Sequence, residues 1–204
     1  VRSDDDGATW FALPGPALDT PLAPSLAVDA GNADRLYLVA GHGVVASSNG
    51  GASFQPLPRP TGAPAGPQLV EFDPVDPARR WTRGLVDAPV SGIPRTTDGG
   101  GTWTEIAPQH ELLGASRTRT NTLFGVNVFL GGGGLSLSRD GGDTWSVRAS
   151  TAFSWFGPMG YGAASGEIYV AGRGFDPITN AELRGVLVST DDGETFVQHP
   201  APPN

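Results

Sequence analysis

Three acidic residues of this chain could take part in cleaving a glycosidic bond: Asp87, Asp176 and Glu182. Glycoside hydrolysis uses two carboxyl groups about 5 to 10 Å apart, one of which donates a proton while the other attacks or activates water. We expect all three residues in loops at one end of the molecule, where Asp87 could pair with Asp176 or Glu182. The alternative is that they are solvated loop acids, because carboxylates are mostly exposed.

Other residues near the same predicted loops could bind a ligand without reacting with it. The longest predicted loop, Gly174–Gly185, holds Asp176, Asn180, Glu182 and Arg184, and a second predicted loop holds His110 and Glu111. Trp155 could stack on a sugar or on a protein side chain, although core packing at the start of a strand is the alternative use of such a ring. The sequence therefore predicts a binding surface made of Asp176, Asn180, Glu182, Arg184, His110, Glu111 and Trp155.

Several other kinds of site lack their residues. All 13 basic residues are arginine, so a phosphate-loop lysine and a Schiff-base lysine are both absent. Cysteine is absent, the three histidines are scattered, and the acidic run at Asp4–Asp6 lacks the late glutamate of a calcium loop. The hairpin-like segment Gly41–Gly43 is followed by no predicted helix that could hold a dinucleotide. We predict neither a metal site nor a cofactor.

Composition limits the partners of the chain. The net charge of −8 would repel a phosphate backbone, so we expect no nucleic acid partner. No stretch approaches the ~20 apolar residues of a membrane helix, so we expect no membrane insertion. The 30 glycines and 19 prolines fall between short strand-like runs such as Arg35–Val39 and Glu167–Val170, which indicates turns between strands.

An eight-residue pattern occurs five times and organises the chain. Its order is hydroxyl, any, Asp or Asn, any, Gly, any, hydroxyl, aromatic, and the closing aromatic residues are 42 to 51 residues apart. This spacing is typical of one four-stranded propeller blade. The acidic or amide residue, the glycine and the aromatic residue of the five copies are Asp5, Gly7 and Trp10; Asn49, Gly51 and Phe54; Asp98, Gly100 and Trp103; Asp140, Gly142 and Trp145; and Asp191, Gly193 and Phe196.

The residue types of the pattern predict the tip of a β-hairpin. The Asp or Asn side chain can accept hydrogen bonds from backbone amides just downstream, and the glycine can adopt a positive φ without steric cost. The aromatic residue would begin the next strand and pack against its neighbours. We therefore interpret the motif as a structural staple.

Together with strand–turn–strand segments such as Leu69–Pro77, the motifs resemble the Asp-box, or BNR-repeat, propellers, a superfamily that includes sialidases, xyloglucan-cleaving glycosidases, the sortilin ectodomain and a photosystem assembly factor. The resemblance implies an all-β propeller of four-stranded antiparallel blades over residues 1–204. About four and a half blades are expected, as a fragment of a larger ring that missing residues or another chain would complete. The expected ranges are a partial blade at 1–13 and blades at about 25–57, 68–107, 112–149 and 155–199.

The same resemblance guides the functional expectation. The sialidase pattern is not met, because Ile93-Pro94 follows Gly92 rather than an arginine, and Tyr161 is the remaining candidate for a free tyrosine. We expect a non-catalytic scaffold, extracellular or at the cell surface, that binds a protein or carbohydrate ligand on the face with the loops between the second and third strands and between blades. The alternative is a glycoside hydrolase of the Asp-box group.

Overall fold

The computed structural model describes residues 1–13, 25–29, 32–40, 43–57, 69–83, 92–127, 134–150, 153–176 and 178–201, which form sixteen strands and no helix. The first two sheets contain β1 (Ser25–Asp29), β2 (Asn32–Ala40), β3 (Gly43–Ser47) and β4 (Gln55–Pro56), and β5 (Leu69–Phe72), β6 (Arg80–Arg83), β7 (Ile93–Thr96) and β8 (Thr104–Ile106). The other two contain β9 (His110–Ala115), β10 (Leu123–Asn127), β11 (Gly134–Ser138) and β12 (Ser146–Ser150), and β13 (Phe153–Tyr161), β14 (Ile168–Phe175), β15 (Glu182–Ser189) and β16 (Val197–Pro200).

Each sheet is an antiparallel meander whose strands pair in chain order. The strands follow from the alternation of the sequence: in β14, buried Ile168 and Val170 alternate with exposed Tyr169. Such a period of two places one face of a strand on a core and the other toward solvent. The predicted all-β class with four-stranded antiparallel sheets is confirmed.

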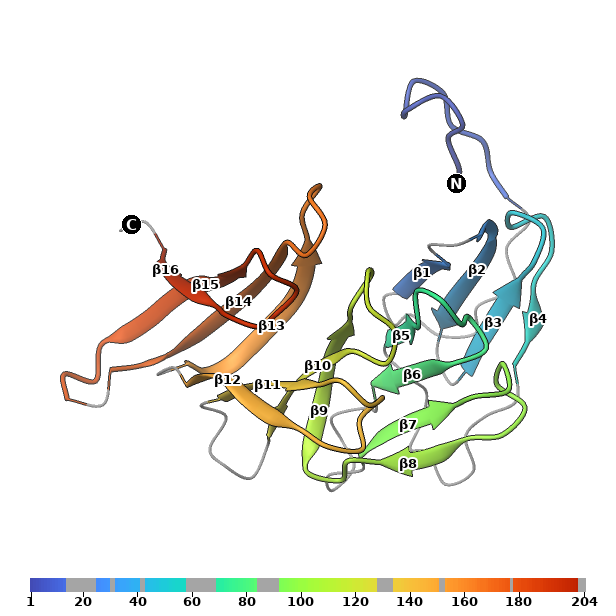
Figure 1. Ribbon diagram of the computed structural model, residues 1–204. Coiled ribbons are helices and arrows are strands. Elements are labelled where there is room, and N and C mark those ends of the chain that lie inside the picture. Colours follow the sequence, from blue (N-terminus) through green and yellow to red (C-terminus); the bar gives the residue numbers. More distant parts are fainter. Residues whose placement is uncertain are drawn as a thin grey trace.

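The four sheets follow one another around an arc, with the first strand of each on the inner side (Figure 1). The inner strands contact one another in sequence, β1 with β5, β5 with β9, and β9 with β13. Residues 1–13, predicted to supply two strands of a partial blade, form a single isolated bridge between Arg2 and Phe11. In the described residues, no helix has the length and apolar character that crossing a bilayer requires.

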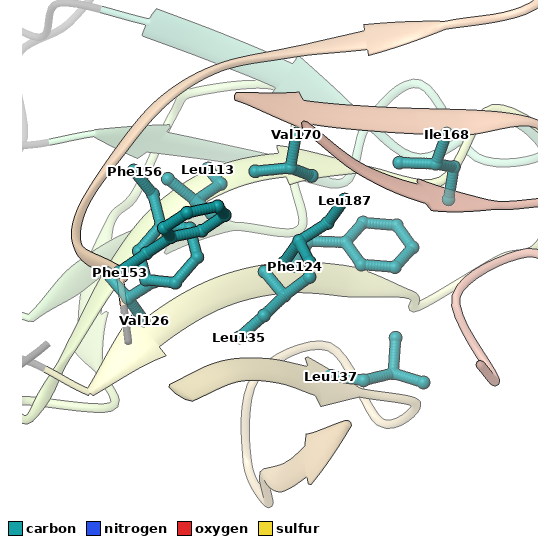
Figure 2. Packing of buried hydrophobic residues seen from close by; sticks show 10 residues of the cluster. All are labelled: Leu113, Phe124, Val126, Leu135, Leu137, Phe153, Phe156, Ile168, Val170 and Leu187. Atoms are coloured by element: carbon teal, nitrogen blue, oxygen red, sulfur yellow. The ribbon is translucent and has the colours of Figure 1, made fainter. Parts of the chain in front are cut away.

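Apolar side chains fill the spaces between neighbouring sheets. Figure 2 shows the largest cluster, between the third and fourth sheets, in which Phe124 and Phe153 are fully buried. Trp81 and Leu123 belong to a second cluster between the second and third sheets, and Tyr37 and Val70 belong to a third between the first and second. Burial of each large side chain contributes about 1.5 to 3 kcal/mol, so these clusters fix the relative positions of the inner strands.

The five eight-residue motifs share one hydrogen-bonding arrangement. In the motif that begins at Ser138, the Gly142 amide donates to the Ser138 hydroxyl (2.8 Å) and the Thr144 amide donates to the Asp140 carboxylate (2.9 Å). In the three motifs that end in Trp, the indole N–H also donates back to the glycine carbonyl, at 2.9 Å for Trp145 and Gly142. The equivalent glycines have φ between 84° and 101°. Four of the motifs join the third and fourth strands of a sheet.

Polar contacts also link the sheets at the turn between their first and second strands. Asp73, which follows β5, accepts hydrogen bonds from Thr120 (2.8 Å) and from the Asn121 amide (2.6 Å) in the β9–β10 turn. Ser116, which follows β9, donates to Asp192 of the fourth sheet at 2.8 Å. The ends of β5 and β9 are thus held by the adjacent sheets.

Candidate functional site

The turn between β14 and β15 contains two of the predicted ligand-binding residues. The Asp176 carboxylate accepts hydrogen bonds from the Thr179 amide (2.7 Å) and the Ile178 amide (2.9 Å), and these bonds hold its pKa below the ordinary value. Asn180 has a φ of 56°, a left-handed conformation that asparagine tolerates better than most residues. Asp176 and Asn180 therefore shape the turn, in which Oδ1 of Asp176 accepts both amides.

Glu182 and Arg184 lie on β15 and pair with each other. The connection predicted over Gly174–Gly185 is shorter than expected, because β14 extends to Phe175 and β15 begins at Glu182. The Arg184 guanidinium donates two hydrogen bonds of 2.9 Å to the Glu182 carboxylate, and this contact lowers the pKa of Glu182. A carboxyl that donates a proton in glycoside hydrolysis needs a raised pKa, and the described candidates Asp176 and Glu182 have the opposite shift.

Trp155 and Arg184 line a groove of about 500 Å³ on the outer face of the fourth sheet, together with Arg173 and His199. Trp155 is 49% exposed, so it does not belong to the cores between the described sheets. The Arg173 guanidinium lies 4.9 Å from the Trp155 ring centroid and is directly opposite Arg184 in the pairing of β14 with β15. Like charges at opposite positions repel, and Glu182, which pairs with Arg184, offsets part of this repulsion. The groove therefore combines an aromatic ring with the guanidinium of Arg173, which an anionic group would stabilise.

The other described site residues do not line this groove. His110 and Glu111 were expected in a loop, but they are the first residues of β9, where they pair with Asn127 and Val126. The His110 ring stacks on Trp145 with centroids 4.5 Å apart, and burial lowers the pKa of His110. Asp87 lies outside the described residues.

A second cavity, of about 610 Å³, lies among the inner strands of all four sheets and was not predicted. Glu71 of β5, Tyr161 of β13 and Arg117, just after β9, are among its lining residues. The Ala115 amide donates a hydrogen bond to the Glu71 carboxylate, and the Tyr161 hydroxyl donates to the Ala115 carbonyl. The Arg117 guanidinium lies 4.2 Å from the Tyr161 ring centroid.

Burial in this cavity shifts both titratable side chains. It raises the pKa of the Glu71 carboxyl to about 7, against the opposing effects of the Ala115 amide and Arg117. Burial and the nearby Glu71 charge raise the pKa of the Tyr161 phenol, which therefore stays protonated at neutral pH. A cavity with converging polar groups and a perturbed pKa is a common property of ligand sites. The available sequence signals were the single acid in the apolar run Leu69–Phe72 and the unassigned Tyr161.

Among the described residues, no group of three or more His, Cys, Asp or Glu side chains is placed to hold a metal ion. No protein-family model and no curated protein matches the chain.

Solved structures do resemble it. A GH74 enzyme from Niastella koreensis has a TM-score of 0.60 and 21% identity, over 86% of this chain and 29% of that chain. An ancestral GH74 enzyme has a TM-score of 0.58 and 15% identity, over 86% and 25% of the two chains. YCF48 from Cyanidioschyzon merolae has a TM-score of 0.55 and 16% identity, over 87% of this chain and 56% of that chain. The chain has a β-propeller fold. At these identities the likeness concerns the fold alone.

In the β-propeller fold, the two cavities lie at opposite ends of the blades. This chain spans about a quarter of the length of the GH74 enzymes and about half of YCF48. With strands A to D numbered from the inside of each blade outward, the groove of Trp155 and Arg184 lies toward the B–C end of the fourth blade. The cavity of Glu71 lies near the opposite A–B end, where β1, β5, β9 and β13 terminate. We call these two sites the groove and the axial cavity.

Proposed function

We propose that this chain is a non-catalytic β-propeller scaffold that binds a protein or glycan partner at the groove of the fourth blade. The supporting observation is that Trp155 and Arg184, two residues predicted to bind a ligand, line one open groove with Arg173. An exposed indole can stack on a sugar ring or an apolar side chain, and arginines bind carboxylates or sulfates. By the resemblance of its repeats, we propose that the chain is an Asp-box propeller and meets its partner outside the cell.

The hydrogen bonds of the two predicted acids favour binding over catalysis. Asp176 is engaged by amides of its own turn, and Glu182 is engaged by Arg184. Neither carboxyl is protonated at neutral pH, because both pKa values are lowered. A two-carboxylate mechanism that used this pair would lack a proton donor.

A glycoside hydrolase remains the second candidate because of one observation. Among the described carboxyl groups with a resolved shift, Glu71 alone has a raised pKa, and a pKa of about 7 suits a proton donor. A catalytic version of this chain would therefore use Glu71 in the axial cavity.

Ligand binding is measured on an array of peptides and of neutral and acidic oligosaccharides. The array is probed with the wild-type protein and with the variants Trp155→Ala and Arg173→Ala. Tyr169→Ala is the matched control, since Tyr169 is also exposed on β14 but does not line the groove. The proposal predicts that both groove variants lose at least about tenfold in affinity, while the control binds like the wild type. Equal binding by all four proteins would contradict it.

Catalysis is tested with a panel of aryl glycosides. Turnover that disappears in Glu71→Gln, Asp176→Asn or Glu182→Gln would overturn the non-catalytic proposal. Size-exclusion chromatography over a range of concentrations shows whether a second chain covers the groove. A change in assembly without a change in ligand affinity on Trp155→Ala would assign this face to a chain–chain contact instead.

A further inference from the structure

We propose that the axial cavity is a second binding site, which takes an aliphatic guanidinium or ammonium group against Glu71, and that the Arg117 side chain occupies this place until a ligand displaces it. This site is independent of the groove, because the two share no lining residue.

The walls of the axial cavity suit an aliphatic chain that ends in a charged group. Leu26 and Val28 of β1 are 60% and 51% exposed and line the cavity together with Met159 of β13. An aliphatic ligand would cover apolar surface that water now contacts. Glu71, on the neighbouring β5, supplies a carboxylate to the same space.

The charges that line the cavity favour a cation. The lining residues include three acids, Asp29, Glu71 and Asp73, and one arginine, Arg117. The Asp73 carboxylate accepts hydrogen bonds from the Thr120 hydroxyl and several backbone amides, and Asp29 lies 3.6 Å from Arg35. Glu71 differs from these two acids in its cationic neighbour. That neighbour is Arg117, whose side chain is exposed and can therefore give way to a ligand.

The contacts of Arg117 indicate that a guanidinium fits beside Glu71 and Tyr161 in the axial cavity. Its guanidinium stacks at 4.2 Å on the Tyr161 ring and acts on the charge of Glu71. The neighbouring Arg119 is held differently, by a 3.0 Å ion pair with buried Asp192. A contact with a ring face is weaker than such an ion pair, so a guanidinium or ammonium from outside can replace Arg117.

Ligand binding should depend on pH through Glu71. The charged and titratable groups that face it are Asp29 on β1, Asp73 after β5, Arg117 after β9 and Tyr161 on β13. A cation requires the ionised carboxylate, and the pKa of Glu71 is about 7. Affinity should therefore rise about tenfold from pH 6 to pH 8, the change in the ionised fraction over that interval.

The experiment uses the single methionine of the chain, Met159, as a reporter inside the cavity. With a ¹³C-labelled methyl group, its NMR signal is followed during titration with agmatine and with the blocked peptide acetyl-Gly-Arg-Gly-amide. The citrulline version of the peptide, which has the same shape and no charge, is the ligand control. We expect saturable shifts with the two cations and none with the citrulline peptide. A response to agmatine alone assigns the site to free amines, and a response to both extends it to arginine side chains of a partner.

Two variants test the roles of the residues. Glu71→Gln should lower the affinity at pH 8 about tenfold and abolish its pH dependence, whereas Arg117→Ala should raise the affinity by removing the internal competitor. Asp143→Asn neutralises a carboxylate that pairs with Arg95 outside the cavity, and it should change nothing. Thermal melting confirms that each variant is folded. An unmoved Met159 signal, a weaker response in Arg117→Ala, or an equal response to the citrulline peptide would overturn the proposal.

Discussion

Carboxyl groups in this chain occupy two kinds of surroundings that shift their pKa values in opposite directions. In the motifs, the Thr195 hydroxyl and amide hold the pKa of Asp191 down to about 2, and the Thr102 amide and hydroxyl lower the pKa of Asp98. In the axial cavity, burial raises the pKa of Glu71 to about 7. The first kind of residue is ionised and stabilises a turn, and the second can exchange a proton near neutral pH.

Replacement of Asp140 tests the turn role at the scale of one residue. Asp140→Ala leaves the Thr144 amide and hydroxyl without their acceptor, so we expect a loss of about 1 kcal/mol in the free energy of unfolding. Asp140→Asn is the matched control, because the equivalent residue of the first sheet is Asn49. Its side chain accepts a hydrogen bond from the Ser53 amide and donates one to the Ser53 hydroxyl, both at 2.9 Å. Urea denaturation measures both variants, and an equal loss in Ala and Asn would contradict the hydrogen-bond assignment.

Replacement of Glu71 by Gln tests the cavity surroundings through pH. A carboxyl whose pKa is higher in the folded than in the unfolded state destabilises the fold as pH rises, here between about 4.5 and 7. Glu71→Gln removes this effect while keeping an acceptor for the Ala115 amide. At pH 8 the variant should be more stable than the wild type, by up to about 3 kcal/mol, and the difference should shrink toward pH 4.

Melting temperatures across this pH range measure the difference. Glu182→Gln provides the contrast, since its pKa is lowered by Arg184 and its removal should give no gain at pH 8. A Glu71→Gln variant that is equally stable relative to the wild type at pH 4 and pH 8 would show that Glu71 is not perturbed.

At the scale of strands, the sequence predicts which strands form and in what order better than it predicts how long each strand is. Strand-like runs and recurring turn motifs were enough to predict four-stranded antiparallel sheets, because alternation and turn chemistry are local properties. The β14–β15 hairpin is longer than predicted, because its ladder continues to the pair Phe175–Glu182, although the charges of Glu182 and Arg184 are typical of loops. His110 similarly belongs to β9, where stacking on Trp145 compensates for its polarity.

The axial cavity could not be predicted from local patterns. Glu71, Arg117 and Tyr161 come from three different sheets, and their proximity depends on how the inner strands converge. A single acid in an apolar strand is compatible with an edge strand, a salt bridge or a cavity. Only the arrangement of β5, β9 and β13 distinguishes these possibilities.

At the scale of the whole molecule, the motif glycines set the distance between blades as well as the shape of turns. A Cβ added to Gly142 would lie 2.5 Å from Cδ1 of Ile106 in the preceding sheet, and one added to Gly51 would lie 2.5 Å from Cδ1 of Leu13. A Cβ on Gly193 would meet the ring of Phe124. In these three motifs the glycine therefore serves two functions: it adopts a positive φ, and it leaves room for an apolar side chain of the segment before its sheet.

A double-mutant cycle separates these two functions. Gly142 has a φ of 101°, so Gly142→Ala combines backbone strain with the clash against Ile106, and we expect a loss of about 2 to 4 kcal/mol. Ile106→Val deletes the Cδ1 atom that the new methyl group would meet and should cost about 1 kcal/mol alone. The double variant should then lose about 1 kcal/mol less than the two single variants lose together, and this difference is the energy of the clash.

Gly160→Ala is the control, because nothing lies within 4 Å of its added Cβ, so this variant should be about as stable as the wild type. Strict additivity in chemical denaturation would mean that strain in the turn, and not contact between blades, accounts for the glycine at this position.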